Sequence, residues 1–261
     1  SVFANASYSV NTIDYMAEVT PRYDYNAFTG HAVGTRMGLV ADGLYQLDDF
    51  NNDGTLKAGL PVPTFGKVQP GDIKYRDLDD SGFIDETDVR KIGDPFYPRF
   101  NYSFGISLDW KGFDLNVLLR GAAGASVNLL DYWNYTVAFV DNNNAFPMAK
   151  GAWAYYPDQG IDKRSEATYP RLTTTANQNN YRASSYWIRK NNFLRVQNIE
   201  IGYDFATNLL RNTRVSSMRL YINATNPFTF SPLLKEFNMD PESGYYYPAL
   251  KSWSRGISIT L

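Results

Sequence analysis

The sequence contains no cysteine and only one histidine, His31. Without cysteine the chain has no disulfide and no thiolate that could act as a nucleophile or metal ligand. A single histidine also rules out a metal site built from several imidazoles. No two carboxylates have a spacing that identifies an acid and a base, so we expect a protein that is not an enzyme.

Long apolar runs and an excess of charge of one sign are also missing. No segment approaches the roughly 18 apolar residues of a transmembrane helix, which excludes a helical membrane protein. The 25 Lys and Arg residues nearly balance the 27 Asp and Glu residues, so no basic surface indicates a nucleic-acid partner. A transmembrane β-barrel remains possible, because its strands alternate in polarity and keep the hydropathy low.

Aromatic residues are abundant, with 20 Tyr, 16 Phe and 5 Trp making up 16% of the chain. Several stand at the ends of alternating segments, namely Tyr102, Trp110, Phe113, Tyr203 and Phe205. Rings concentrate at such positions where strands cross the two membrane–water interfaces. The aromatic content therefore favours a membrane barrel.

Six segments alternate apolar and polar residues with the period of two that is typical of a β-strand. In the clearest, 101–110, the alternation has no exception, and it resumes after Lys111 and Gly112. Two such segments joined by two residues predict a β-hairpin. A change of parity near Gln197 and Asn198 predicts a β-bulge. The six predicted strands are 4–11, 101–110, 113–120, 193–205, 218–225 and 253–261.

Long and short connections alternate between these strands. We expect 14–98 and 121–191 to be long loops, whereas 111–112 and 206–215 are short. Antiparallel strands then place the long loops at one end and the short turns at the other, as in outer-membrane barrels with extracellular loops and periplasmic turns. We therefore predict an all-β fold, the C-terminal part of a large antiparallel transmembrane β-barrel. Six strands cannot close it, so we expect further strands before Ser1.

A twelve-residue segment that starts at Asp77 matches the pattern of an EF-hand calcium loop. Gly82 stands at the sixth position, where the loop turns sharply, and Ile84 supplies the apolar eighth residue. The segment departs from the pattern in its last residue, where Asp88 replaces the longer glutamate. The predicted metal ligands are Asp77, Asp79, Ser81, the carbonyl of Phe83, Asp85 and Asp88.

We expect this loop to bind calcium and to brace a long extracellular loop, although the pattern does not distinguish calcium from magnesium. The alternative is an acidic turn without metal, with Gly82 in a left-handed conformation.

Aromatic residues also concentrate between 133 and 187. Exposed rings with amide neighbours suit stacking on sugars, contact with an extended peptide or contact with a protein partner. They equally suit packing of the loop on itself. The candidates for cargo or partner binding are Trp133, Tyr135, Trp153, Tyr155, Tyr186 and Trp187.

Several short motifs occur in an order that resembles the C-terminal part of the SusC/RagA-type TonB-dependent transporters. They include Gly38 to Gln46, Pro70 to Tyr75 before the acidic loop, and Ile92 to Pro95. Phe193 to Ile199 and Leu220 to Phe228 continue the series, so the resemblance covers nearly the whole chain. Leu261 departs from it, because these barrels end on an aromatic residue.

The resemblance implies a protein of the outer membrane with about 22 strands and an N-terminal plug domain. It also implies import of glycans or peptides as cargo, with a SusD-like surface lipoprotein as partner and energy from TonB. The plug, the segment that contacts TonB and the earlier strands are expected outside 1–261.

Two other classes of protein remain open at this point. The first is a secreted, calcium-binding β-sandwich that binds glycans. Its apolar residues would meet in a dry interior, whereas in a barrel they would face lipid. The second is a glycan hydrolase, for which no carboxylate pair is identified.

Overall fold

The computed structural model describes residues 1–205, 210–211 and 214–261. The chain forms two compact units. Unit 1 consists of 1–9, 97–125 and 191–261, and unit 2 consists of 10–96 and 126–190. Sequence analysis predicts one barrel segment with two long loops, whereas these loops form a compact unit of their own.

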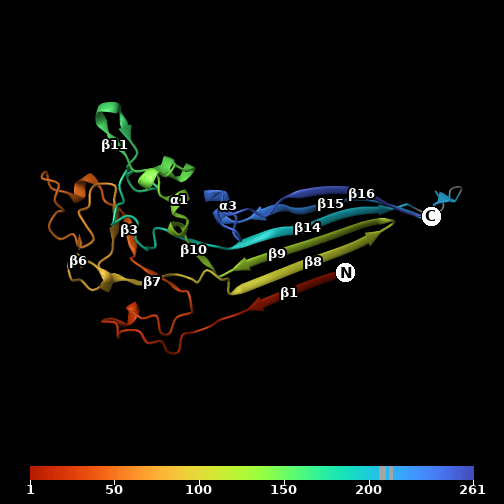
Figure 1. The fold of residues 1–261 in the computed structure, drawn as a ribbon, viewed down its shortest axis with the longest axis horizontal. Helices are drawn as coiled ribbons and strands as arrows, with labels where there is room; N and C mark the ends of the chain where they lie inside the picture. Colours follow the sequence, from red (N-terminus) through yellow and green to blue (C-terminus); the bar gives the residue numbers. More distant parts are fainter. Residues whose placement is uncertain (206–209, 212–213) are drawn as a thin grey trace. The chain divides into compact units, whose positions relative to one another are not determined.

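Unit 1 contains a six-stranded sheet in which every neighbouring pair is antiparallel (Figure 1). None of the helices in the described residues is both long and apolar enough to cross a membrane. The strands, in their order across the sheet, are β1 (Val2–Tyr8), β8 (Phe100–Trp110), β9 (Phe113–Ala123), β14 (Phe193–Asp204), β15 (Ser217–Phe230) and β16 (Ser252–Thr260).

These strands confirm the six segments predicted from the sequence, with shifted ends. β1 ends at Tyr8, so 9–11 lie outside it, and β9 continues to Ala123. β15 extends to Phe230, beyond the predicted end at 225, and includes Pro227. Much of the predicted short connection 206–215 lies outside the described residues.

The hairpin between β8 and β9 forms as predicted. Trp110 pairs with Phe113 and closes the ladder. Lys111 and Gly112 have φ values of 50° and 88°, so both adopt the left-handed conformation of a type I′ turn, which matches the twist of the flanking strands. The predicted bulge also forms, because the register of β14 with both neighbours shifts between Val196 and Asn198.

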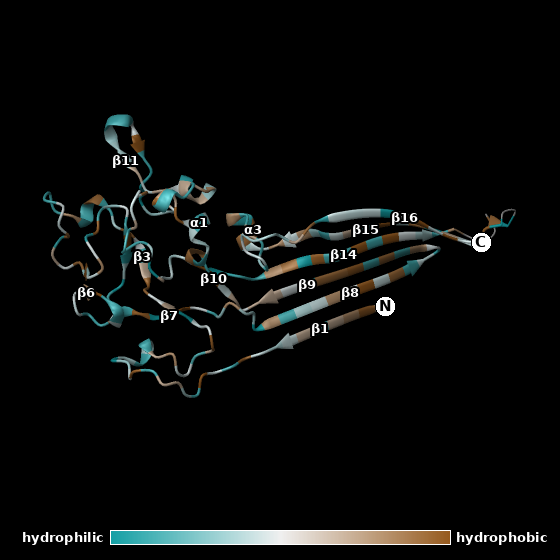
Figure 2. Cartoon of the chain, viewed as in Figure 1, coloured by the Kyte–Doolittle hydropathy of each residue, from teal (hydrophilic) through white to brown (hydrophobic). Residues whose placement is uncertain are grey.

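One face of the sheet is apolar from edge to edge. Direct partners across the strands lie on the same face, and one such row contains Trp110, Phe113, Tyr203, Leu220 and Ile257. Figure 2 shows the alternation of hydrophobic and hydrophilic residues along β8. The apolar side chains stay exposed, as the value of 63% for Ile257 illustrates.

The predicted alternative of a β-sandwich is therefore wrong. A sandwich buries the apolar face of one sheet against a second sheet. Among the described residues, the sheet of unit 1 is the only one with more than two strands. Its central apolar residues remain accessible, with exposures of 53% for Leu108 and Ile201 and 58% for Ile222.

The opposite face of the sheet is polar and cross-linked by ion pairs. Arg219 on β15 contacts Asp114 on β9 at 2.6 Å and Glu200 on β14 at 2.8 Å. Asn223 donates to Asn198 at 2.8 Å. Charged groups in these partly buried positions bind one another across three strands, so this face is organised without an apolar core.

The connection between β15 and β16 folds onto this polar face. It begins with the helix α3 (Pro232–Phe237). Asp240 accepts from Arg195 at 2.7 Å, and Glu242 accepts from both Arg195 and Arg120. Arg195 is only 3% exposed and also donates to Thr229. Its guanidinium therefore fixes the connection to β14.

Unit 2 is built from short ladders, short helices and turns around a core that includes Leu39, Tyr45, Tyr75, Tyr169 and Trp187. Its strand pairs are β2 (Arg36–Gly38) with β7 (Arg90–Gly93), β3 (Ala41–Leu44) with β5 (Ile73–Tyr75), β4 (Val62–Pro63) with β6 (Phe83–Ile84), β10 (Ser126–Asn128) with β13 (Ile188–Lys190), and β11 (Tyr155–Tyr156) with β12 (Ile161–Asp162). Its helices are η1 (Asp24–Asn26), η2 (Leu47–Asp49), η3 (Glu86–Asp88), η4 (Leu129–Tyr132), α1 (Trp133–Thr136), η5 (Val140–Asn142), η6 (Pro147–Gly151) and η7 (Pro157–Gln159).

Substitutions on neighbouring residues of β8 test whether the apolar face contacts lipid. Ile106 lies near the middle of the strand on the apolar face, and Ser107 points to the polar face. We expect Ile106→Arg to destabilise the full-length protein in a bilayer by about 2–4 kcal/mol, because the charge enters hydrocarbon. Ser107→Arg should cost much less. Denaturant unfolding in lipid vesicles measures both, and equal effects would contradict a lipid-facing surface.

Candidate functional site

Trp187, one of the predicted binding residues, is part of the core of unit 2. It is 1% exposed, and its indole Nε1 donates to the carbonyl of Asn180 at 2.7 Å. Its ring packs edge-on against Tyr169 and Tyr186, with centroids 5.7 and 5.0 Å away. Burial raises the pKa of the Tyr186 hydroxyl to about 12. In this structure the Trp187 ring has almost no accessible surface and packs in the core, and its role in cargo binding stays a prediction.

The other predicted binding aromatics are partly buried by contacts within unit 2. Trp153 donates from Nε1 to the side chain of Gln46 at 3.2 Å. Trp133 packs edge-on against Tyr181, with centroids 5.4 Å apart. These contacts follow the alternative in which the rings pack the loop on itself, and they leave only part of each ring available.

Tyr135 and Tyr155 are closer to the surface. Tyr135 is 37% exposed and contacts the ring of Phe146 at a centroid distance of 4.9 Å. Tyr155 carries the guanidinium of Arg164 over its ring at 4.1 Å. The structure therefore does not bring the six predicted aromatics together into one platform, and their role in cargo binding stays a prediction.

The acidic loop brings three of its six predicted metal ligands together. Asp77, Asp79 and Asp88 each offer a carboxylate oxygen, and these three atoms lie within 4.8 Å of one another. Gly82 has a φ of 81°, and Ile84 is fully buried, as the loop pattern requires. This spacing suits oxygen ligands around a divalent cation.

The remaining predicted ligands make other contacts. The Asp85 carboxylate accepts from the amide of Thr87 at 2.7 Å and so caps η3. Ser81 donates from Oγ to the carbonyl of Phe83 at 3.3 Å. Asp85 does not belong to the three-carboxylate group, whereas Ser81 lies beside it, since its amide donates to both Asp77 and Asp79.

The carboxyls of this loop differ in their proton affinity. Hydrogen bonds from Ser81 and Thr87 hold the pKa of Asp79 at about 2. Burial raises the pKa of Asp88, and the charges of Asp77 and Asp79 add to the effect. Asp88 is fully buried and accepts from the amides of Leu78 and Asp85 at 2.6 and 2.9 Å. A cation would favour its ionised form, because it would offset the repulsion among the three carboxylates.

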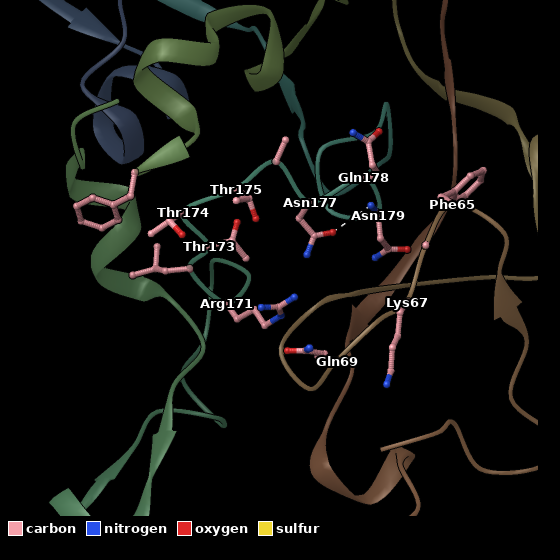
Figure 3. A pocket seen from close by; sticks show the side chains of 14 residues that line it. Phe65, Lys67, Gln69, Arg171, Thr173, Thr174, Thr175, Asn177, Gln178 and Asn179 are labelled. Carbon is pink, nitrogen blue, oxygen red and sulfur yellow. Dashed lines mark hydrogen bonds between the residues drawn. The ribbon is translucent and has the colours of Figure 1, made fainter. Parts of the chain in front are cut away.

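The second site in unit 2 is an open cavity of about 610 Å³, which sequence analysis did not predict. Its wall is rich in amide and hydroxyl groups, and Figure 3 shows Arg171, Asn177, Gln69 and Lys67 around it. Ligand sites commonly have volumes of about 300–1,000 Å³, so this cavity is large enough for a small ligand or for the end of a larger one. Its lining residues are Phe65–Lys67, Gln69, Phe139 and Arg171–Asn179.

The fully buried carboxylate of Asp72 lies behind the cavity wall and binds several of the residues that form it. One oxygen accepts from Arg171 Nε at 2.6 Å and from Asn177 Nδ2 at 2.9 Å. The same oxygen accepts from Asn180 Nδ2 at 2.9 Å, and the other accepts from the amide of Gln69 at 2.8 Å. Because three of these four donors belong to lining residues, Asp72 sets the positions of much of the wall.

The turn that presents Asp72 depends on Gly71. Gly71 has a φ of 88°, a conformation that a side chain disfavours. A Cβ atom there would also lie 2.7 Å from the ring of Trp153 and 2.9 Å from Cβ of Arg171. The amide of Gly71 donates to the carbonyl of Tyr45, and its carbonyl accepts from the amide of Arg171, both at 2.8 Å. Two main-chain hydrogen bonds therefore fix this turn, and the ring of Trp153 leaves no room for a side chain at Gly71.

Two asparagines continue the cavity wall along the neighbouring strand β5. Asn180 Oδ1 accepts from the amide of Ile73 at 2.8 Å, and Asn179 Nδ2 donates to the carbonyl of Ile73 at 2.8 Å. Tyr75 adds a bond from its hydroxyl to the carbonyl of Asn179 at 2.7 Å. These side chains bond to the main chain of β5 in addition to its pairing with β3, so the segment after Arg171 has a defined position.

No family model matches the chain. It is 27% identical over 216 residues to the TonB-dependent receptor P3 of Formosa agariphila, a match that covers 83% of this chain and 19% of that protein. A structure of the RagAB peptide transporter superposes with a TM-score of 0.63 and 17% identity, covering 99% of this chain and 27% of that one. The RagAB peptide importer in its open-open state gives a TM-score of 0.62 at 17% identity, covering 100% of this chain and 26% of that one.

These matches confirm the predicted fold. The chain spans about a fifth of the curated relative and about a quarter of the structural neighbours. The curated relative is named as a receptor, and RagAB is named as a transporter or importer. That agrees with the expectation from the sequence that the chain has no catalytic site.

Replacement of the buried carboxylate tests its role in the cavity. We expect Asp72→Asn to lose the ion pair with Arg171 and to destabilise unit 2 by about 1.5–3 kcal/mol, because hydrogen bonds to charged groups contribute that much. Hydrogen exchange at the amides of Gln69 and Arg171 should accelerate. Asp48→Asn, which removes an exposed carboxylate in the same unit, is the matched control. Equal exchange in the two variants would contradict the organising role.

Proposed function

We propose that the chain is a portion of a SusC/RagA-type TonB-dependent transporter of the outer membrane, and that the whole protein imports oligopeptides or glycans. In this proposal TonB supplies energy through the N-terminal region, and a SusD-like surface lipoprotein is the partner that presents cargo. The name of the RagAB peptide transporter supports peptide as one class of cargo.

The two-faced sheet of unit 1 is the observation on which this proposal rests. Its exposed apolar face suits contact with hydrocarbon, and its polar face suits a water-filled interior. A wall of this kind separates lipid from an aqueous path through which hydrophilic cargo can pass. The ion pairs of Arg219 with Asp114 and Glu200 stiffen the inner surface of that wall.

Unit 2 is the part that we expect to meet cargo outside the cell. Its two chain segments leave the sheet at the end opposite the short turn formed by Lys111 and Gly112, which is the extracellular end in barrels of this type. The cavity beside Arg171 supports this role, since it offers a recessed polar surface. Tyr135 is an additional candidate for contact with cargo or with the lipoprotein.

Uptake by whole cells tests the proposed transport. Cells that lack the full-length gene should fail to accumulate a labelled oligopeptide mixture or a labelled oligosaccharide mixture, and the restored gene should recover one of the two. Removal of TonB should abolish the recovered uptake. Recovery that does not need TonB would contradict the proposal, as would unchanged uptake of both mixtures after deletion.

We also propose that the acidic loop binds calcium and that the ion braces unit 2. The approach of Asp77, Asp79 and Asp88 to within 4.8 Å favours this site over a simple acidic turn. Such an ion would tie the loop to η3, because Asp88 ends that helix. It would also reach η1 through Tyr23, whose hydroxyl donates to Asp79 at 3.2 Å.

Calorimetric titration of the full-length protein with calcium tests this site. Asp79→Asn should weaken binding by at least about tenfold, because it removes a charged ligand. The adjacent Asp80→Asn is the matched control, since Asp80 lies outside the group of three carboxylates.

Calcium affinity should also fall between about pH 7 and about pH 4, as protons compete for carboxyls such as Asp88, whose pKa is raised. The absence of binding heat, or equal losses in the Asp79→Asn and Asp80→Asn variants, would contradict the site.

A further inference from the structure

The cavity in unit 2 carries an excess of positive charge. Arg171 and Lys67 line it, and none of its lining residues is an aspartate or a glutamate. Asp72 offsets the charge of Arg171 from behind the wall, at 2.6 Å from Nε. The charge of Lys67 acts on Asp53, whose pKa it helps to lower, but no carboxylate of the wall itself offsets it, so the cavity favours an anionic group.

Arg171 is oriented toward such a group before any ligand arrives. Its Nε and Nη2 atoms donate to the two oxygens of Asp72. A guanidinium has five N–H groups, so these bonds leave three, including both hydrogens of Nη1. Within the described part of the chain, Nη1 has no hydrogen-bond partner. A planar group held in this way suits a carboxylate, which accepts charge-assisted hydrogen bonds.

The rest of the wall suits a peptide main chain. Asn177 and Gln178 carry side-chain amides, which can donate to a carbonyl and accept from an N–H. The hydroxyls of Thr174 and Thr175 add groups of both kinds. Phe65 gives the wall an apolar patch, and Arg182 stands 3.5 Å over its ring. No Trp or Tyr lines the cavity, so the larger and more polar rings that could stack on a sugar are missing from the wall.

We propose that this cavity binds the C-terminal carboxylate of an oligopeptide, with Nη1 of Arg171 and Nζ of Lys67 as the carboxylate ligands. The amide and hydroxyl wall then receives the main chain of the last residues. This inference rests on the proposed import function and narrows it to peptides with a free C-terminus. A cavity of about 610 Å³ accommodates only the end of a longer chain, so the remainder of the peptide extends outward.

Binding of a matched pair of peptides to the full-length transporter tests the proposal. The probes are tetraalanine with a free carboxylate and the same peptide with a C-terminal amide. We expect the free acid to bind at least about tenfold more tightly, because hydrogen bonds between charged groups contribute most to such a contact. Lys67→Gln should reduce this preference at least about threefold, whereas it should leave binding of the amide nearly unchanged.

Lys57→Gln is the matched control, because Lys57 is an exposed lysine of unit 2 that does not line the cavity. Arg171→Lys keeps the charge but loses the planar group, and it should also reduce the preference. Because Arg171 contacts the buried Asp72, hydrogen exchange at the amide of Gln69 checks that this variant keeps the wall intact.

Equal affinity of the acid and the amide for the unaltered protein would overturn the proposal. Equal losses in Lys67→Gln and Lys57→Gln would do the same. Digalacturonate is a third probe. If it binds and neither peptide does, the cavity binds the carboxylate of a sugar and the proposal is overturned. The import function is tested separately, because it fails if deletion of the gene leaves the uptake of both labelled mixtures unchanged.

Discussion

A strict alternation of apolar and polar side chains is the constraint on which unit 1 depends. Because successive residues of a strand point to opposite faces, a slip of one residue would place Arg195 or Asp114 among the apolar residues. The turn at Lys111 and Gly112 fixes the register of β8 and β9, and the bulge in β14 preserves the two faces where the sequence parity changes. One layer of chain therefore presents an apolar face on one side and a polar face on the other.

In unit 2 a different kind of contact adds to the core, namely the burial of the Asp72 carboxylate. A buried charge is costly unless it is paired and hydrogen-bonded, and Asp72 meets that requirement with donors from four residues. The contacts tie the turn after Pro70 to the segment that follows Arg171. Regular secondary structure is sparse in this unit. Side-chain hydrogen bonds to Asp72 and Ile73 therefore connect segments that longer strands would otherwise join.

The features that sequence analysis predicted correctly are those set by neighbouring residues. The hairpin at Lys111 and Gly112 follows from a local pattern, and so does the grouping of Asp77 with Asp79. The Asp72 cluster joins residues about a hundred positions apart, and no periodicity indicates such a meeting. Its one sequence signal was the motif from Pro70 to Tyr75, which supported the family resemblance without revealing that Asp72 is buried.

The aromatic residues show a second limit of sequence analysis. A tryptophan suits a binding surface and a core equally well, so the burial of Trp187 could not be read from its type or its position. Asp85 illustrates the same ambiguity for a carboxylate. A carboxylate oxygen can bind a cation, or it can accept a hydrogen bond from the first amides of a short helix. In the structure Asp85 caps η3.

The ion pairs of Arg195 limit how far the connection after β15 can move away from the sheet. If Asp240 and Glu242 moved away from the sheet, the guanidinium of Arg195 would lose both counter-charges. Arg195 is only 3% exposed, so water could not replace them easily. Breaking one partner of a buried ion pair typically costs about 3–5 kcal/mol, and thermal motion at that cost is rare. This connection therefore stays fixed on the polar face of the sheet, and any rearrangement of that face must come from other residues.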